Sequence, residues 1–368
     1  LVLYLPKKQL LDLEKLKNEG RSLLLNLLNR FSKKIAIDLG TATVIIYESD
    51  KGIVLQEPSF VALDTNTNKV IAVGEEARRM LGRTPGNIEV VRPLKDGVIA
   101  NFEIAELMLK NFLKKVGVKS RFIKPLIMVC IPVGVIGVES RAVLEAAVQV
   151  GARKAFLIEE PVAAAIGAGL SIEKAEGNMV IDIGGGTTEI AVLSLGGIVV
   201  GESIRVGGDK FDEALVRFVR ENYNLVIGES TAEEIKINIG SADQNFSAKY
   251  EVKGRDLMTG LPRHIELSAQ ETHKAFKELL DNIAHAARRV LEKTPPELSA
   301  DIVEKGIILT GGGSLLKGID KFISDRTEVG AFVTDDPLVC VAEGTGQALN
   351  ELDKISNVLS TGDQGILS

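Results

Sequence analysis

The sequence predicts an α/β fold built from two pseudo-symmetric α/β domains that face each other across a cleft. One phrase occurs twice, as Ile37-Asp38-Leu39-Gly40-Thr41-Ala42-Thr43 and as Ile181-Asp182-Ile183-Gly184-Gly185-Gly186-Thr187, each time between two β-branched runs. A longer unit of strand, turn, helix, strand and small-residue helix also occurs twice, starting at residues 126 and 306. Each half is therefore a hairpin followed by strand–helix–strand–helix, and two such halves place a ligand at their interface.

The repeated phrase predicts a hairpin with a tight, glycine-rich tip. Backbone N–H groups beside glycines can approach an anion closely, and an aspartate at the end of a strand can hold a hydrated divalent cation. One copy alone is a weak signal, because aspartate and glycine are ordinary turn residues. Two copies in opposite halves indicate loops on either side of a phosphate chain, with Asp38 and Asp182 as cation ligands rather than turn caps.

Composition argues against several other classes of protein. The 368 residues suffice for two sizeable cores, and 45% hydrophobic with 26% charged residues is typical of a soluble globular chain. A formal charge of −6 argues against a nucleic-acid binder. Cys130 and Cys340 lie far apart in apolar, strand-like runs, so we expect buried thiols in a reducing compartment. None of the three histidines has zinc-site spacing, and no apolar run has the length of a transmembrane helix or the features of a signal peptide.

Residues 1–34 differ from the rest of the chain. Leu24, Leu27, Leu28 and Phe31 recur at helical spacing, while asparagine, arginine and lysine occupy most other positions. An apolar stripe beside a basic polar face is what a helix lying in a membrane interface needs. The same pattern is equally compatible with a helix docked on its own domain or on a partner.

The remaining elements follow from periodicity and chain punctuation. β-branched runs predict strands, and apolar residues three and four apart predict helices. Beyond the two hairpins, we expect strands at 52–54, 60–63, 126–131, 155–158 and 306–309, and a strand-like segment at 249–267. We expect helices at 75–81, 104–116, 138–150, 162–169, 211–221, 231–239 and 272–291. Pro295-Pro296 stop the last helix, and Glu160 lies at a helix start, where a carboxylate is electrostatically favoured.

The order of these features resembles the actin-like ATPase superfamily, which includes actin, the sugar kinases and the heat-shock chaperones. Longer strings narrow the resemblance to the bacterial actin family of MreB and its paralogues; they lie at 52–59, 92–100, 156–168, 178–190, 232–240, 291–297 and 310–318. The resemblance extends from Lys34 to Leu352. One departure is Thr43, where the family usually carries asparagine; a threonine hydroxyl can still donate to phosphate.

The resemblance implies two domains, each with a smaller subdomain. Residues 34–61, 104–174 and 341–360 would form the core of domain I, with 62–103 as its small subdomain. Residues 175–210 and 275–340 would form the core of domain II, with 211–274 as its small subdomain. Residues 1–33 would be an N-terminal extension and 361–368 a tail.

The resemblance also implies a site for ATP and Mg²⁺. The phosphates would meet the backbone of Thr41, Ala42, Thr43, Gly184, Gly185, Gly186 and Thr187, with Gly208 nearby. The nucleoside would meet Glu233, Glu234, Ile235 and Lys236, and the α-phosphate and adenosine would meet Gly312, Gly313, Ser314 and Leu315. Asp38 and Asp182 would hold Mg²⁺ through its waters, and Glu160 would polarise the attacking water. The plainer interpretation of Glu233 and Lys236 is a solvated ion pair within one helix.

In function, the chain resembles an ATPase that polymerises into single or double filaments. By this resemblance it would lie on the inner face of the cytoplasmic membrane, hydrolyse ATP to ADP and phosphate, and guide the cell-wall elongation complex that maintains rod shape. Phe122 and Ile123, an apolar tip between basic residues, match a membrane-insertion loop of that family. A sugar or acetate kinase would need an inserted acceptor site, which the short stretches between motifs do not offer. A chaperone-type switch would continue into a peptide-binding domain, for which the chain leaves no room.

Overall fold

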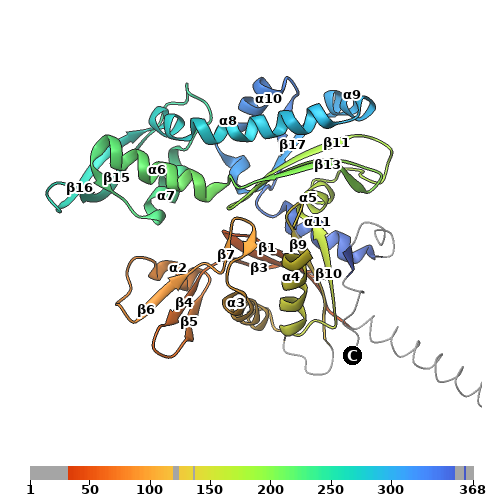
Figure 1. Cartoon of the computed structure of the whole chain (residues 1–368), viewed down its shortest axis with the longest axis horizontal. Helices are drawn as coiled ribbons and strands as arrows, with labels where there is room; N and C mark the ends of the chain where they lie inside the picture. The colour runs from red at the N-terminus through yellow and green to blue at the C-terminus, as the bar shows by residue number, and fades with distance from the viewer. Residues whose placement is uncertain (1–31, 119–123, 136, 353–359, 362–368) are drawn as a thin grey trace, which may run out of the picture.

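Two mixed β-sheets organise the molecule: the first half of the chain supplies the first sheet except for its edge strand β19, and the second half supplies the other. The structure is a computed structural model and describes residues 32–118, 124–135, 137–352 and 360–361. It has two lobes: strands β1 to β10 belong to the lower lobe in Figure 1, and strands β11 to β18 to the upper lobe.

The two main sheets have the same internal order. The first runs β3-β2-β1-β9-β10-β19 and the second β13-β12-β11-β17-β18. In each sheet the first hairpin strand pairs antiparallel with the next strand and parallel with a later one. The first sheet consists of β1 (Lys34–Leu39), β2 (Thr43–Glu48), β3 (Gly52–Pro58), β9 (Leu126–Ile131), β10 (Lys154–Glu159) and β19 (Ser360–Thr361). The second consists of β11 (Asn178–Ile183), β12 (Thr188–Ser194), β13 (Gly197–Ile204), β17 (Ile307–Thr310) and β18 (Ala331–Val333). This repeated order confirms the predicted two-domain α/β fold and its internal duplication.

Helices connect the parallel strands, as βαβ crossovers require. Helix α4 (Gly137–Gln149) joins β9 to β10. In the other lobe, the short 3₁₀ helix η1 (Gly312–Leu315) and α10 (Ile319–Thr327) join β17 to β18. Helix α8 (Ala269–Lys293) packs against β12 and β13; the Ser268 and Glu271 side chains form its capping box, and it ends before Pro295. Helix α9 (Pro296–Lys305) follows.

Each lobe also carries a smaller three-stranded sheet, ordered β5-β4-β6 in the lower lobe and β14-β15-β16 in the upper lobe. The lower one comprises β4 (Val61–Asp64), β5 (Lys69–Val73), β6 (Ile88–Val91) and α2 (Glu75–Met80), followed by the β7–β8 pair (Leu94–Lys95, Val98–Ile99) and α3 (Phe102–Lys115). The upper one comprises α6 (Gly208–Tyr223), β14 (Leu225–Val226), α7 (Glu229–Ile239), β15 (Lys249–Asp256) and β16 (Pro262–Ser268). The residue limits of the four predicted subdomains stay a prediction.

Helices α5 (Glu160–Gly167) and α11 (Cys340–Asn350) lie between the two main sheets (Figure 1) and share a hydrophobic core with both. Their backbones touch: a Cβ built on Gly344 would lie 1.8 Å from the Ala163 carbonyl oxygen. Both cysteines are buried free thiols, as predicted. The strand expected at Cys340 is wrong, because β18 ends at Val333 and Cys340 begins α11.

The membrane elements expected from sequence fall outside the described residues. These are the stripe Leu24, Leu27, Leu28 and Phe31 and the loop tip Phe122-Ile123. Across the part of the chain that the structure describes, no helix has both the length and the apolar character needed to cross a membrane.

Candidate functional site

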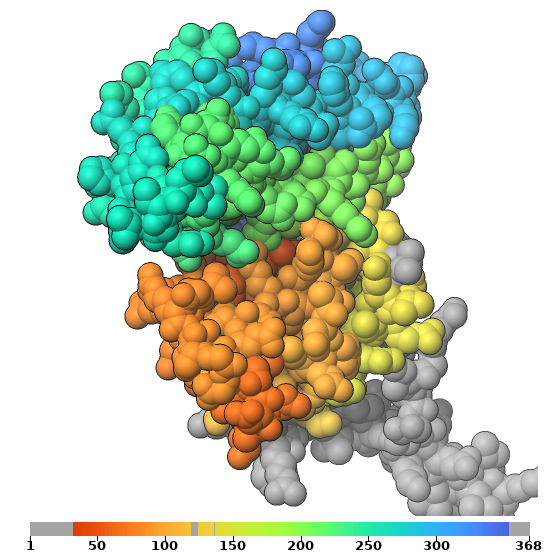
Figure 2. Space-filling model, turned by 60° about the vertical axis from the view of Figure 1, so that its left-hand side comes forward, coloured from red at the N-terminus to blue at the C-terminus, as the bar shows by residue number. Residues whose placement is uncertain are grey.

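A cavity of about 620 Å³ lies between the lobes and is lined by both of them. Figure 2 shows the groove from one side, between the orange residues of the lower lobe and the green residues of the upper lobe. Most of the residues predicted for the site line this cavity; these are Asp38, Thr41, Ala42, Thr43, Glu160, Asp182, Gly184, Gly185, Gly186, Thr187, Gly208, Glu233, Lys236, Gly312, Gly313 and Leu315.

The tips of the two hairpins face each other across the cavity and come into close contact. A Cβ built on Gly185 would lie 2.5 Å from the Ala42 Cβ, and one built on Gly186 would lie 2.5 Å from the Thr41 hydroxyl oxygen. Glycine is therefore required here by the close approach of two backbones from different lobes. Helix α6 fixes the second tip, because the Gly208 N–H donates to the Gly184 carbonyl at 3.0 Å. The Gly184 N–H itself donates to the Thr187 carbonyl at 2.9 Å, so it is already used within the hairpin.

Three carboxylates, Asp38, Asp182 and Glu160, gather in the cavity, and no lysine or arginine among the described residues forms an ion pair with them. Burial raises the pKa of Asp38 to about 6, although the Cys130 thiol donates to its Oδ1 at 3.2 Å and opposes the shift. Burial and the charges of Asp38 and Glu189 raise the pKa of Asp182 to about 8. Burial, then Glu189, Asp182 and Asp38, raise the pKa of Glu160 well above its usual range. A site of this kind favours the arrival of positive charge.

The chemistry of this donor set fits a hydrated divalent cation. Asp182 Oδ1 is buried and, within the described residues, has no hydrogen-bond partner. No group of three histidine, cysteine, aspartate or glutamate side chains in those residues is arranged to enclose a metal ion. Two aspartates at the ends of facing strands can hold magnesium through its water shell, which that ion gives up reluctantly.

Glu160 enters the cavity from the start of α5, directly after the buried strand β10. The preceding residue, Glu159, takes the N-cap position, and burial raises its pKa. Glu160 thus lies at the positive end of a helix, as its sequence position predicted.

Sequence reasoning missed Glu189. It is 1% exposed and lies directly opposite Asp182 in the second hairpin. Its carboxylate accepts the Val133 N–H of the other lobe at 3.0 Å and the Ser203 hydroxyl at 2.7 Å. Burial raises its pKa to about 6 against these hydrogen bonds. Cross-strand pairing with Asp182 was the available signal, because directly opposed residues share one face of a sheet.

Helix α7 brings two of its four predicted residues to the cavity. Glu233 and Lys236 line it, whereas Ile235 is buried in the hydrophobic core and Glu234 is exposed. The 3.6-residue period of a helix cannot turn four consecutive side chains to one face. Lys236 donates to Asp212 at 2.8 Å and to the Gly208 carbonyl at 3.0 Å. Glu233 pairs with Arg78 of the other lobe, so the two residues do not form the alternative pair within α7.

The turn after β17 forms another wall of the cavity. A Cβ built on Gly313 would lie 2.2 Å from Ile183 Cγ2, and one on Gly311 would lie 2.3 Å from Asp182 Oδ1. Ser314 is 2% exposed and donates its hydroxyl to the Gly311 carbonyl at 2.7 Å, so its side chain supports the turn from behind.

The amino-acid sequence is similar to those of known proteins. The MreB/Mbl protein family model matches residues 32–357. The cell shape-determining protein Mbl of Bacillus cereus is 53% identical over 326 residues, covering 88% of this chain and 98% of its own. The cell shape-determining protein MreB of Escherichia coli K12 is 51% identical over 330 residues, covering 88% and 95%.

Solved structures show the same fold. MreB5 of Spiroplasma citri bound to AMPPNP is similar with a TM-score of 0.84 and 39% identity, over 89% of this chain and 99% of that one. The MamK double helical filament has a TM-score of 0.75 at 20% identity, over 87% and 99%, and shows the fold alone. Sequence and structure together show that this chain is an actin-like protein of the MreB/Mbl family.

Proposed function

We propose that the chain binds ATP with Mg²⁺ in this cleft and hydrolyses it to ADP and phosphate. The observation that carries the proposal is the group of Asp38, Asp182 and Glu160, three carboxylates gathered in the cavity beside two glycine-rich hairpin tips. The carboxylates suit a metal ion, and the glycine-rich backbones suit the phosphates that the ion accompanies. The similarity to MreB5 structures bound to AMPPNP and to ADP supports this choice of ligand.

Different residues of the chain would bind the phosphates, hold the metal ion and orient the attacking water. The hairpin backbones at 41–43 and 185–187 would bind and align the phosphates, and Asp38 and Asp182 would hold Mg²⁺ through water. The ion, when bound, supplies charge neutralisation of the phosphate oxygens. Glu160, in its ionised form, would accept a hydrogen bond from the attacking water and orient it, which stabilises the transition state more than the ground state.

Replacing Glu160 tests this division. Glu160→Ala should leave nucleotide affinity nearly unchanged while slowing phosphate release by a factor of about 100 or more. Phosphate release and ATP affinity are measured on the same preparation. A hydrolysis rate within about twofold of wild type would contradict the role of Glu160.

We further propose that ATP drives assembly into filaments at the inner face of the cytoplasmic membrane, where they guide the cell-wall elongation machinery. The names of the MreB and Mbl relatives, cell shape-determining proteins, support the shape role. The membrane part rests on the sequence of the N-terminal stripe and of Phe122-Ile123. Sedimentation with ATP, with and without anionic liposomes, tests assembly and membrane binding separately.

A further inference from the structure

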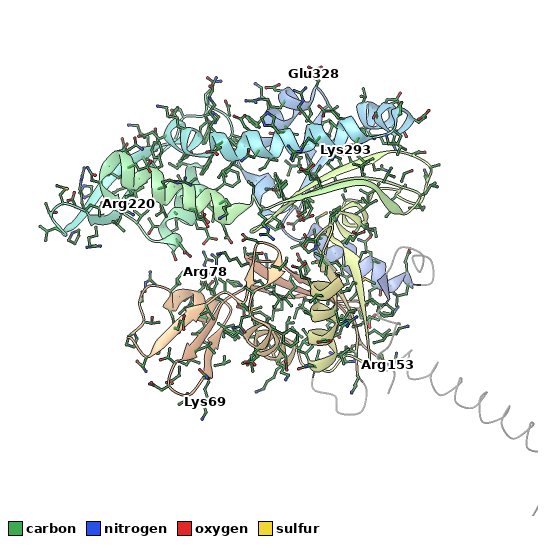
Figure 3. All side chains as sticks on the ribbon, viewed as in Figure 1. Lys69, Arg78, Arg153, Arg220, Lys293 and Glu328 are labelled. Atoms are coloured by element: carbon green, nitrogen blue, oxygen red, sulfur yellow. The ribbon has the colours of Figure 1, made fainter. Side chains whose placement is uncertain are left out.

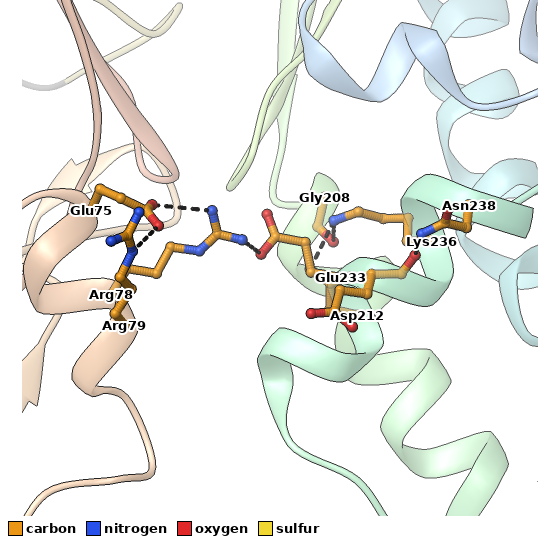
Figure 4. A network of polar contacts seen from close by, with 9 residues as sticks. Glu75, Arg78, Arg79, Gly208, Asp212, Glu233, Lys236 and Asn238 are labelled. Carbon is orange, nitrogen blue, oxygen red and sulfur yellow. Dashed lines mark hydrogen bonds and ion pairs between the residues drawn. The ribbon is translucent and has the colours of Figure 1, made fainter. Parts of the chain in front are cut away.

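An ion pair joins the two lobes over the nucleoside end of the cleft. Arg78, on α2 of the lower lobe, donates from Nη2 to Glu233 Oε2 on α7 of the upper lobe, 155 residues along the chain (Figure 4). Figure 3 shows Arg78 at the upper margin of the lower lobe, facing the other lobe. Each of the two side chains is 33% exposed, so the pair is partly shielded from solvent.

The lower lobe holds the Arg78 guanidinium in place. Its Nη1 lies 3.7 Å from Glu75 Oε2, and the Glu75 N–H donates to Glu57 Oε2 at 2.8 Å. The neighbouring Arg79 is bound differently: it donates to Glu75 Oε1 at 3.0 Å, its side chain is 75% exposed, and it does not line the cavity. Two adjacent arginines therefore share one carboxylate, but only Arg78 crosses the cleft.

On the upper lobe, Glu233 depends on that contact. Lys236, one helical turn away, is already engaged by Asp212 and by the Gly208 carbonyl. The positive charge that orients the Glu233 carboxylate therefore comes from the opposite lobe (Figure 4). A second cross-cleft pair, Arg92 with Asp209 at 2.7 Å, lies near the phosphate end, beside Gly208.

We infer that Arg78 is a positioning residue for the nucleoside: it fixes the Glu233 carboxylate only when the lobes are closed, and so makes nucleotide retention depend on closure. The inference rests on the proposed function, because it takes the ligand of the cavity to be a nucleotide. Separation of the lobes breaks this pair and removes the partner that orients Glu233. Recognition of the nucleoside and closure of the cleft thereby become one event.

The experiment measures release of tritium-labelled ADP after a chase with unlabelled ADP, at protein concentrations too low for assembly. Arg78→Gln should release ADP about two- to tenfold faster than wild type, the range expected for a partly shielded, charge-assisted pair. Arg78→Lys should fall between the two, because lysine keeps the charge but not the planar fork. The matched control is Arg79→Gln, which changes the same helix turn and the same Glu75 and should release ADP as wild type does.

Two further measurements separate positioning from general loosening. Affinity for tripolyphosphate, which lacks the nucleoside, should be unchanged by Arg78→Gln in calorimetric titration. Raising salt from about 0.05 M to about 0.5 M should speed ADP release from wild type more than from Arg78→Gln, because the screened pair is already lost in the variant.

Equal ADP release from Arg78→Gln and Arg79→Gln would overturn the inference, as would a parallel loss of tripolyphosphate affinity. In both cases the wild type still binds nucleotide, so the proposed function stands. A wild type that binds neither ADP nor tripolyphosphate would overturn the proposed function and the inference with it.

Discussion

Replacing Asp182 with asparagine should stabilise the nucleotide-free protein while weakening its response to Mg²⁺-ATP. Asp182 is 6% exposed, its Oδ1 has no hydrogen-bond partner among the described residues, and its pKa is raised from 3.8 to about 8. Between these two pKa values the folded state binds more protons than the unfolded chain. The contribution of Asp182 to stability is therefore complete below about pH 4 and is lost as the pH rises toward 8.

The size of the effect follows from the pKa difference. At about 1.4 kcal/mol for each pKa unit, a rise from 3.8 to about 8 corresponds to roughly 5–6 kcal/mol as an upper limit. Asp38 and Glu160 lie in the same site and take up protons together with Asp182, so the free-energy cost is shared among the three carboxylates and Asp182 alone accounts for only part of it. We expect Asp182→Asn to gain about 1–3 kcal/mol near pH 8, or roughly 2–6 °C in melting temperature, and much less near pH 5.

Thermal melts in chelator at several pH values measure this difference. The control is Asp325→Asn, which makes the same change at an exposed position of α10 and should leave the pH profile unaltered. On adding Mg²⁺ and ATP, Asp182→Asn should gain less stability than the wild type gains. If the variant and the wild type have the same melting temperature at every pH, burial of this carboxylate does not lower the free energy of unfolding and the prediction is refuted.

The remaining predictions concern the hairpins, the metal and the membrane. Gly185→Ala should lower nucleotide affinity at least about tenfold, because the added methyl group collides with Ala42; Gly197→Ala, where a Cβ meets nothing within 4 Å, is the control, and equal affinities would contradict the close approach. Asp182→Ala should weaken binding of a fluorescent ATP analogue mainly in the presence of Mg²⁺, and an unchanged Mg²⁺ dependence would make Asp182 a turn residue only. Deleting residues 1–33 should sharply reduce pelleting of filaments with anionic vesicles, and adding Phe122→Ser and Ile123→Ser should remove the rest without lowering ATP affinity. Pelleting that survives all of these changes would show that neither element is an anchor.

Local pattern was enough to predict the two α/β halves and the two aspartates at the hairpin tips. The duplicated hairpins are apolar, β-branched runs with an aspartate before each glycine tip, and their partner strands are adjacent in sequence, so both hairpins could be anticipated. The glycines at Gly185 and Gly186 also mark, from local sequence, a tip that an anion can approach closely, whereas their contact with Thr41 and Ala42 of the other lobe came from the structure.

Contacts between distant segments could not be predicted in the same way. The partner of Glu233 is an arginine of the other lobe, and nothing in either local sequence marks the pair. Glu189 was overlooked because its buried carboxylate is satisfied partly by the Val133 N–H, a backbone group that leaves no trace in the sequence. A short apolar run such as the one around Cys340 is ambiguous between strand and helix, and in the structure the chain turns after β18 so that Cys340 begins α11.

The contact between α5 and α11 determines how much apolar surface is exposed when the cleft opens. Gly167 and Gly344 remove the side chains that would interlock there: a Cβ on Gly167 would lie 2.0 Å from the Cys340 carbonyl oxygen. Smooth backbones can roll on each other without withdrawing large groups from a core, so a rotation about this contact exposes little new apolar surface. Because heat capacity follows newly exposed apolar surface, nucleotide-linked closure should show a small heat-capacity change. A calorimetric series over temperature can therefore distinguish a pivoting lobe from one that undocks.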